Sequence, residues 1–149
     1  MGLDFTRARY RRPSHTLDVA AAEVVLAVEL LDLLDWHPDL VHSVTPDGRF
    51  LFANRAWLAA LGYERADLPR LTLLDVAAPE DHPFVVNRIA DALDGHALPS
   101  ERAHLVRRDG TRLAVDGSTV MHFMDGLPIG TITIMRSAGP PARGALQGA

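Results

Sequence analysis

Three of the five Asp-Gly pairs in this 149-residue chain constrain its fold more than any other feature, because each stands between two predicted strands. The pairs are Asp47-Gly48, Asp109-Gly110 and Asp125-Gly126. Asp-Gly in that setting is a strong signal for a tight turn that joins two antiparallel strands. We therefore predict strands over these ranges: 40–45, 49–53, 99–107, 111–124 and 128–136.

The stretch between the second and third predicted strands is expected to be helical. Asn54 stands where a helix N-cap belongs, and Gly62 ends this helix, as glycine often does at a C-terminus. Pro79-Glu80-Asp81 begins another helix, with its acids at the positive end of the helix dipole, and Asp94-Gly95 closes it. The predicted fold class is therefore α+β: a five-stranded antiparallel sheet with helices inserted after strand two.

Both faces of this sheet are expected to be covered. In the second strand, alternation places Phe50 and Phe52 on one face and Leu51 and Ala53 on the other, and both pairs are apolar. The inserted helices are expected to cover one face, and an N-terminal helix is the natural cover for the other.

An N-terminal amphipathic helix is predicted over 16–37, because His37-Pro38 ends it and its apolar residues recur at alternating spacings of four and three. Such a heptad-like seam predicts a homodimer interface, with an ordinary cap helix in a monomer as the alternative. The seam consists of Leu17, Ala21, Val24, Val28 and Leu31. We expect the flanking segments, an arginine-containing tail over 1–15 and a Gly/Pro/Ala-rich tail over 138–149, to be disordered.

Composition excludes several classes of function. The net charge of −4 favours no nucleic-acid partner, and the absence of cysteine excludes disulfides, thiolate metal sites and cysteine nucleophiles. The apolar-rich stretch 17–34 contains four acids, whereas a membrane span needs about 20 mostly apolar residues. We therefore expect no membrane partner and a cytoplasmic protein.

The turn and cap motifs together resemble a known family, the PAS domains. The run 47–56, Asp-Gly-Arg-Phe-Leu-Phe-Ala-Asn-Arg-Ala, followed by Leu-Gly-Tyr at 61–63, resembles the opening of these domains. Pro79-Glu80-Asp81 resembles the acidic start of their long helix. The segments 107–111 and 126–130 resemble their later hairpins. The order and spacing of these pieces, more than any one of them, carry the resemblance, which covers a PAS domain over 39–137.

The resemblance implies a sensory or interaction module in signal transduction, whose inner sheet face and helices enclose a pocket. Some members of the family bind haem, flavin or small metabolites, and many dimerise through a helix before the domain. Here Arg136 leads into Gly139-Pro140-Pro141, where most signalling members continue into an output helix. We therefore expect the signal to leave through the N-terminal helix or through a separate kinase or transcription regulator.

Strand parity and helix spacing give a set of candidate ligand-binding residues, all of them apolar. A small apolar ligand could occupy the pocket they would line, or the side chains could fill the core and leave a ligand-free dimerisation adaptor. The candidates are Leu51, Ala53, Leu58, Leu61, Val85, Ile89, Leu105, Leu113, Val115 and Ile134.

Cofactor chemistry receives little support from the sequence. A cysteine-adduct flavin is excluded, because the chain has no cysteine. Haem-binding relatives place their ligand about one turn beyond His82, where this chain has Val85 and Val86, so a haem gas sensor is only a further alternative.

Metal binding and catalysis receive still less support. Glu80, Asp81 and His82 are consecutive and do not converge on one metal ion. Asp116 and His122 lie about 20 Å apart along one strand, too far for an acid–base pair, so we expect no catalysis.

Overall fold

The computed structural model of this protein describes residues 27–138. The chain divides into two compact units, Met1–Leu33 and Leu34–Ala149. In the first unit the described residues, 27–33, are helical, and the helix continues to residue 36. The predicted seam residues Val28 and Leu31 lie on this helix, whereas Leu17, Ala21, Val24 and the tails 1–15 and 139–149 lie outside the described residues.

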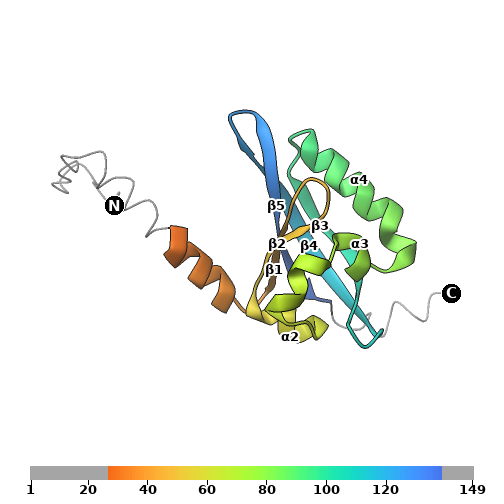
Figure 1. The fold of residues 1–149 in the computed structure, drawn as a ribbon. Coiled ribbons are helices and arrows are strands. Elements are labelled where there is room, and N and C mark those ends of the chain that lie inside the picture. The colour runs from red at the N-terminus through yellow and green to blue at the C-terminus, as the bar shows by residue number, and fades with distance from the viewer. Residues whose placement is uncertain (1–26, 139–149) are drawn as a thin grey trace, which may run out of the picture. The chain divides into compact units, whose positions relative to one another are not determined.

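The second unit is built on one antiparallel sheet, as the Asp-Gly turns predict (Figure 1). Its strands lie in the order β2-β1-β5-β4-β3. The Asp-Gly turns join β1 to β2, β3 to β4 and β4 to β5, so the prediction of three hairpins is confirmed. The strands are β1 (Leu40–Val44), β2 (Phe50–Ala53), β3 (Leu98–Val106), β4 (Arg112–Met124) and β5 (Leu127–Ser137).

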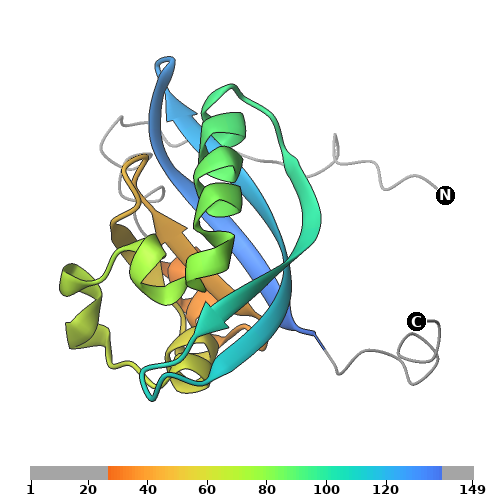
Figure 2. The same cartoon turned by 90° about the vertical axis from the view of Figure 1, so that its right-hand side faces the viewer.

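The helices between β2 and β3 pack on one face of the sheet, here called the inner face. Helix α4 lies along this face (Figure 2), and a short bridge from Ala77 to Leu105 ties the preceding segment to β3. The elements are α2 (Arg55–Leu61), η2 (Arg65–Arg70), α3 (Leu73–Val76), η3 (Pro79–Asp81) and α4 (His82–Leu93).

Helix α2 begins and ends where local chemistry predicts. Asn54 Oδ1 accepts a hydrogen bond of 3.0 Å from the backbone N–H of Trp57, which fills one of the free donors of the first turn. Gly62 has φ of 78°, the left-handed conformation that glycine adopts without steric cost. The helix carries Trp57 and Leu61, both fully buried, into the core.

The hydrophobic core lies between the inner face and the helices. Trp57 is its centre, with the Phe50 ring 5.1 Å and the Tyr63 ring 6.2 Å from the indole. Its other buried members come from β1, β2, α2, η2, α3 and the three C-terminal strands: Leu40, Val44, Ala53, Leu61, Leu68, Val76, Leu105, Val115 and Met135.

The predicted alternation in β2 is wrong, because the strand pairing contains a bulge. Ser43 pairs with Phe52 but Val44 pairs with Phe50, so Leu51 is an extra residue in the ladder. Both Phe50 and Ala53 are therefore buried, while 56% of Leu51 is exposed. A β-bulge changes which side chains share a face, and simple alternation does not foresee it.

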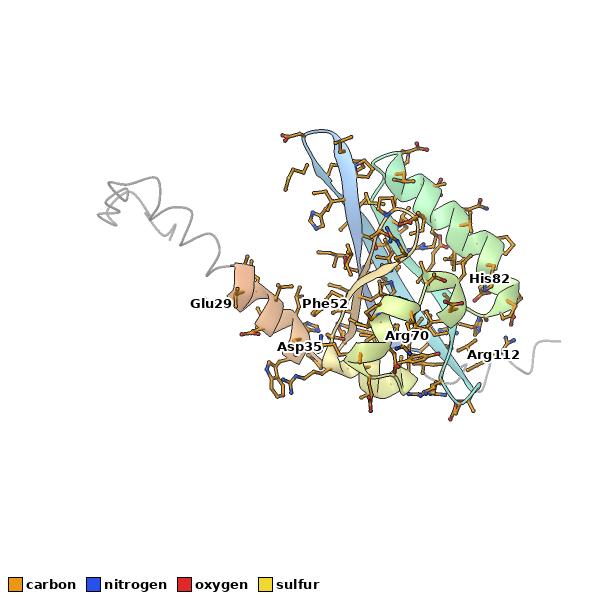
Figure 3. The ribbon with its side chains drawn as sticks, viewed as in Figure 1. Glu29, Asp35, Phe52, Arg70, His82 and Arg112 are labelled. Carbon is orange, nitrogen blue, oxygen red and sulfur yellow. The ribbon has the colours of Figure 1, made fainter. Side chains whose placement is uncertain are left out.

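Ion pairs tie the C-terminal end of the helix 27–36 to α2 and η2. Asp35, labelled in Figure 3, lies at the end of this helix. It accepts hydrogen bonds of 2.8 Å from Arg55 Nε and 2.8 Å from Arg65 Nη2. Burial raises the pKa of Asp35, but its two arginine partners outweigh burial and hold that pKa below its usual value. The Arg55 guanidinium also lies 3.8 Å from the centroid of the Trp36 ring. Among the described residues, no helix is long and apolar enough to cross a membrane.

Candidate ligand-binding cavity

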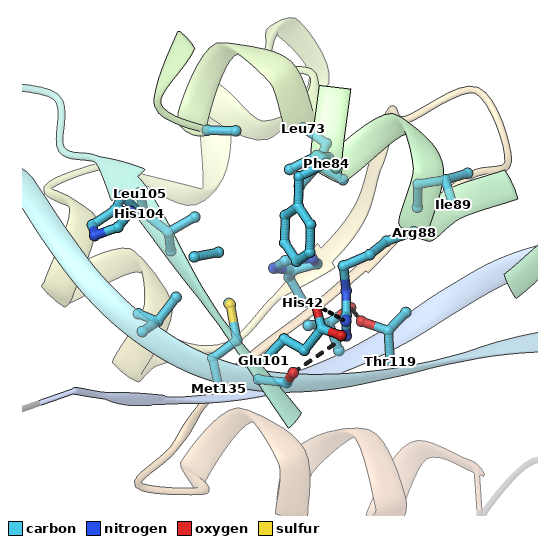
Figure 4. A pocket seen from close by; sticks show the side chains of 16 residues that line it. His42, Leu73, Phe84, Arg88, Ile89, Glu101, His104, Leu105, Thr119 and Met135 are labelled. Atoms are coloured by element: carbon cyan, nitrogen blue, oxygen red, sulfur yellow. Dashed lines mark hydrogen bonds and ion pairs between the residues drawn. The ribbon is translucent and has the colours of Figure 1, made fainter. Parts of the chain in front are cut away.

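A cavity of about 70 Å³ lies between α4 and the inner face of the sheet. Its apolar wall comes from both layers and comprises Leu73, Ala77, Phe84, Val85, Ile89, Ala103, Leu105, Val115 and Met135. Its polar lining comprises His42, Arg88, Glu101, His104, Thr119 and Thr133 (Figure 4). The cavity is therefore apolar at one side and hydrogen-bonding at the other, as ligand sites commonly are.

His42 is the most unusual group in this wall. It occupies an inward position of β1, between Leu40 and Val44, and only 3% of it is exposed. Within residues 27–138, its Nδ1 has no hydrogen-bond partner. Burial lowers the pKa of His42 to about 4, because the charged imidazolium would lose its hydration. His42 is therefore neutral at pH 7, with a free hydrogen-bonding atom inside the protein.

Aromatic contacts hold the His42 ring in place. The Phe50 ring lies 5.5 Å away and the Trp57 ring 6.2 Å away, both in edge-to-face arrangements. Such geometry is favoured between aromatic rings and leaves little room for rotation.

Arg88 brings a positive charge from α4 to the cavity. Only 15% of its side chain is exposed. Its Nη2 donates to the carbonyl oxygens of Pro99 at 3.2 Å and Gly117 at 3.3 Å, and its Nη1 lies 3.4 Å from Glu101 Oε2. The Phe84 ring lies 5.5 Å from the guanidinium carbon. Arg88 thus links α4 to β3 and β4 across the cavity.

Two threonines complete the polar side. Thr119 on β4 pairs with Thr133 on β5, and their hydroxyl oxygens lie 2.9 Å apart. Both residues are buried, and one hydroxyl donates a hydrogen bond to the other.

His104 and Asp81 fix the end of the cavity at the start of α4. The backbone N–H of His104 donates to Asp81 Oδ2 at 2.8 Å, and His104 Nδ1 lies 3.2 Å from the same oxygen. These contacts hold the first turn of α4 against the edge strand β3.

Comparison with known proteins identifies the fold that this geometry belongs to. A family model described as "PAS fold" matches residues 34–140, more than two thirds of the chain. The chain belongs to the PAS family. PAS domains are sensory and signalling modules, so the family sets the class of function. No curated protein sequence matches the chain.

Solved PAS structures superpose over most of the chain at low sequence identity. The PAS domain of an HTR-like protein from Haloarcula marismortui has a TM-score of 0.65 at 18% identity, covering 82% of this chain and 99% of that one. A domain of a sensory box sensor histidine kinase/response regulator from Geobacter sulfurreducens has a TM-score of 0.65 at 22% identity, covering 77% and 96%. A PAS domain from Colwellia psychrerythraea has a TM-score of 0.69 at 13% identity, covering 76% and 97%. Likeness at these identities concerns the fold.

The ten predicted pocket residues fall into three groups in this PAS domain. Four line the cavity: Val85, Ile89, Leu105 and Val115. Four belong to the packed core beside it: Ala53, Leu58, Leu61 and Leu113. The remaining two, Leu51 and Ile134, lie on the opposite face of the sheet.

Leu51 and Ile134 were predicted to lie on the inner face of the sheet, and this prediction is wrong for a different reason at each residue. Leu51 is the bulged residue of β2, and its Cδ1 would lie only 2.9 Å from a Cβ on Gly130 of β5. On β5 the inward positions are held by Thr131, Thr133 and Met135, so Ile134 points outward and is 39% exposed. The prediction followed the apolar residues of β5, whereas this strand places threonines inside.

Sequence analysis missed the polar lining of the cavity: His42, Arg88, Glu101, His104, Thr119 and Thr133. The sequence pattern of β1 could have identified one of these residues. His42 stands two positions after Leu40 and two before Val44, so strand alternation places all three side chains on the same, buried face. Arg88 is not distinguishable by pattern from the other polar residues of α4.

The histidine considered for haem makes a different contact. His82 Nε2 lies 3.1 Å from the carbonyl oxygen of Ala77, and Val85 lines the cavity one turn further along. A cavity of about 70 Å³ corresponds to roughly two water molecules and is too small for a porphyrin. Among residues 27–138, no group of three or more potential ligand side chains converges to hold a metal ion.

The two residues considered for catalysis do not meet. Asp116 accepts hydrogen bonds from Arg102 at 3.1 and 3.3 Å, and this arginine lowers the pKa of the carboxyl. His122 lies six residues along β4 and is exposed. Asp116 is thus in a strand-to-strand ion pair, which is a structural arrangement.

Proposed function

We propose that this PAS domain senses a small molecule held in the cavity beneath α4 and passes the change to a partner protein, without catalysing a reaction. The observation that carries this proposal is the buried Nδ1 of His42, which faces no partner in the described part of the chain. An unpaired buried polar atom costs about 1–3 kcal/mol, and a bound ligand would recover that energy. A protein that needed only a packed core would gain stability from an apolar side chain at this position.

The expected ligand differs from the purely apolar one that strand parity suggests. Arg88, Thr119 and Thr133 add polar groups to the same cavity, so an amphipathic molecule fits better. A ligand that contacts Arg88 would act on α4, β3 and β4 together, because Arg88 bonds to carbonyl oxygens of both strands. This linkage supports a route from the cavity to the rest of the sheet.

The helix 16–37 is proposed as the dimerisation and output element, with the PAS domain over 39–137. Val28 and Leu31 are three positions apart, so they lie on one side of the described helix. The C-terminal end of this helix is anchored at Asp35 and Leu34 to the start of α2. A kinase or transcription regulator is the proposed partner, and a cytoplasmic location goes with such a partner.

A ligand-free dimerisation adaptor is the second candidate. The specific observation in its favour is the size of the cavity, about 70 Å³, which two or so water molecules would fill. In that case the waters would satisfy His42, and the signal would come from the partner.

Native mass spectrometry of gently purified protein separates these candidates. We expect a retained small molecule in the wild type and its loss in Ala103→Leu, which places a larger side chain at the cavity wall. Ala59→Leu is the matched control, because Ala59 is exposed on α2. A bare mass for the wild type, also after incubation with cell extract, would favour the adaptor.

A further inference from the structure

The polar side of the cavity carries information on the chemical class of its ligand. We infer, on the basis of the proposed sensory function, that the ligand is a short hydroxycarboxylate whose carboxylate pairs with Arg88 and whose hydroxyl meets His42. Three features of the cavity carry this inference: the way Arg88 is paired, the free atom of His42, and the volume between them.

Arg88 is a buried cation with a replaceable partner. Only 15% of its side chain is exposed, whereas 49% of the side chain of Glu101 is exposed. A guanidinium binds a carboxylate best through two parallel hydrogen bonds, but Glu101 approaches Nη1 with one oxygen at 3.4 Å. The two carbonyl oxygens that Arg88 contacts both use Nη2. A ligand carboxylate can therefore displace the Glu101 carboxylate from Arg88, because the exposed Glu101 side chain can rotate into solvent.

His42 selects a hydroxyl group. The ring is neutral and buried, so one nitrogen carries a proton and the other a lone pair. A hydroxyl can both donate and accept, and it therefore suits the cavity side of the imidazole in either tautomer. A second carboxylate at this position would face Phe50 and Trp57, whose rings flank His42 and offer no charge. The ligand therefore carries one charged group and one neutral hydroxyl.

The volume limits the ligand to a short chain. The cavity of about 70 Å³ is lined between its polar groups by Val85, Ile89, Val115 and Met135. Allowing for the space that the Glu101 carboxylate vacates, a chain of about two or three carbon atoms fits. Glycolate and lactate are probes of this size.

Displacement of Glu101 would also change the edge of the sheet. The pairing of β3 with β4 is irregular between Leu98 and Glu101, where Arg88 also holds the carbonyl oxygen of Pro99. A ligand that takes Arg88 from Glu101 therefore acts on the least regular part of β3 (Figure 4).

NMR titration of the full chain tests the inference directly. Glycolate and lactate are compared with acetate and propionate, which lack the hydroxyl, and with lactamide, which lacks the charge, at matched ionic strength. We expect backbone signals of the cavity residues to shift, with hydroxy acids binding at least about tenfold tighter than either analogue, since one hydrogen bond or one ion pair is lost. This comparison needs no variant and therefore no assumption about folding.

Two variants separate the roles of the charges. Arg88→Gln should abolish binding of every acid, whereas Arg102→Gln, on the opposite face, should leave it unchanged. Glu101→Gln should tighten binding severalfold, because it removes the competing carboxylate. An unchanged affinity in Arg88→Gln would overturn the inference.

Other outcomes would also overturn it, and they are distinguishable from failure of the proposed function. If sodium chloride alone produces the same shifts, the cavity holds any anion. If a neutral molecule is retained and no carboxylate binds, the ligand class is wrong but the sensory function stands. If no small molecule of any class binds, both proposals fail and the adaptor remains.

Discussion

Asn54 Nδ2 donates a hydrogen bond of 3.0 Å to the carbonyl oxygen of Leu34, twenty residues earlier in the chain. The same amide nitrogen lies 3.2 Å from the carbonyl oxygen of His37 and 2.8 Å from that of Asp39. Its Oδ1 accepts from the backbone N–H groups of Val41 and Trp57. One buried side chain thus joins the end of the N-terminal helix, the start of β1 and the first turn of α2.

Replacing Asn54 should therefore destabilise the domain more than the loss of a helix cap alone. We expect Asn54→Ala to lower the free energy of unfolding by about 3 kcal/mol, because a cap is lost and buried backbone groups are left unpaired. Asn54→Ser should recover only about 1 kcal/mol, since serine can cap α2 but cannot reach the three carbonyl oxygens. Urea denaturation measures both changes.

Asn87→Ala is the matched control, because Asn87 is exposed on α4 and its replacement should change stability by less than about 0.5 kcal/mol. Equal effects of the Asn54 and Asn87 substitutions would contradict the role assigned to Asn54.

His42 should make the stability of the domain depend on pH. Its pKa is about 4 in the folded protein and near 6.5 when unfolded, so the unfolded state binds the proton more tightly. Stability is therefore complete above pH 6.5 and falls as pH drops from 6.5 toward 4, by about 3 kcal/mol in total at 1.36 kcal/mol per pH unit. Arg88, Glu101 and His104 line the same cavity and belong to the electrostatic surroundings of this titration.

Urea denaturation at pH 7.5, 6.5, 5.5 and 4.5 tests this dependence. In His42→Phe the loss of stability between pH 6.5 and 4.5 should largely disappear, whereas His122→Gln, at an exposed histidine of β4, should keep it. Several carboxyl groups with lowered pKa values, including Asp47 and Asp109, contribute at more acidic pH, below this window. A wild-type protein with constant stability from pH 7.5 to 4.5 would rule out a buried neutral His42.

Local signals predicted most of the fold, and long-range pairing accounts for what they missed. The Asp-Gly turns, the Asn54 cap and the Gly62 stop each act over a few residues, so sequence alone identifies them. The bulge at Leu51 depends on how β1 pairs with β2, and no pattern within β2 reveals it.

The same distinction explains the partial prediction of the cavity. Apolar candidates such as Val85 and Val115 followed from periodicity, because a core face is read from the spacing of apolar residues. His42, Arg88 and Thr133 became cavity residues only when three elements met, and their polar character argued against burial. Buried polar groups are thus the residues that sequence pattern assigns least well.

Gly117 should control the shape of the cavity. A Cβ at this position would lie 2.5 Å from Met135 Cγ and 3.2 Å from the carbonyl oxygen of Ile134. Because the methionine side chain is flexible and lines the cavity, Gly117→Ala should push Met135 into the empty space. We expect a loss of about 1–3 kcal/mol in unfolding free energy and a loss of ligand uptake.

The double variant Gly117→Ala with Met135→Ala supplies the control, because alanine has no Cγ and so lacks the atom in closest contact. It should lose less stability than the two single variants together, which thermal denaturation of the wild type, both single variants and the double variant would show. Purely additive effects would mean that the two side chains do not meet.

The proposed dimer interface makes the final prediction. Val28 and Leu31 are three positions apart in the seam, and in a parallel pair of helices in register the two Val28 side chains would lie close to each other. Val28→Asp would place two carboxylates in this apolar seam and should weaken the dimer by about 100-fold or more. Light scattering coupled to sizing chromatography should therefore show a monomer.

Glu29→Lys is the control, because it changes a charge beside the seam and the protein should remain a dimer. A Val28→Asp protein that stays dimeric, with an unchanged far-UV spectrum, would place the interface elsewhere.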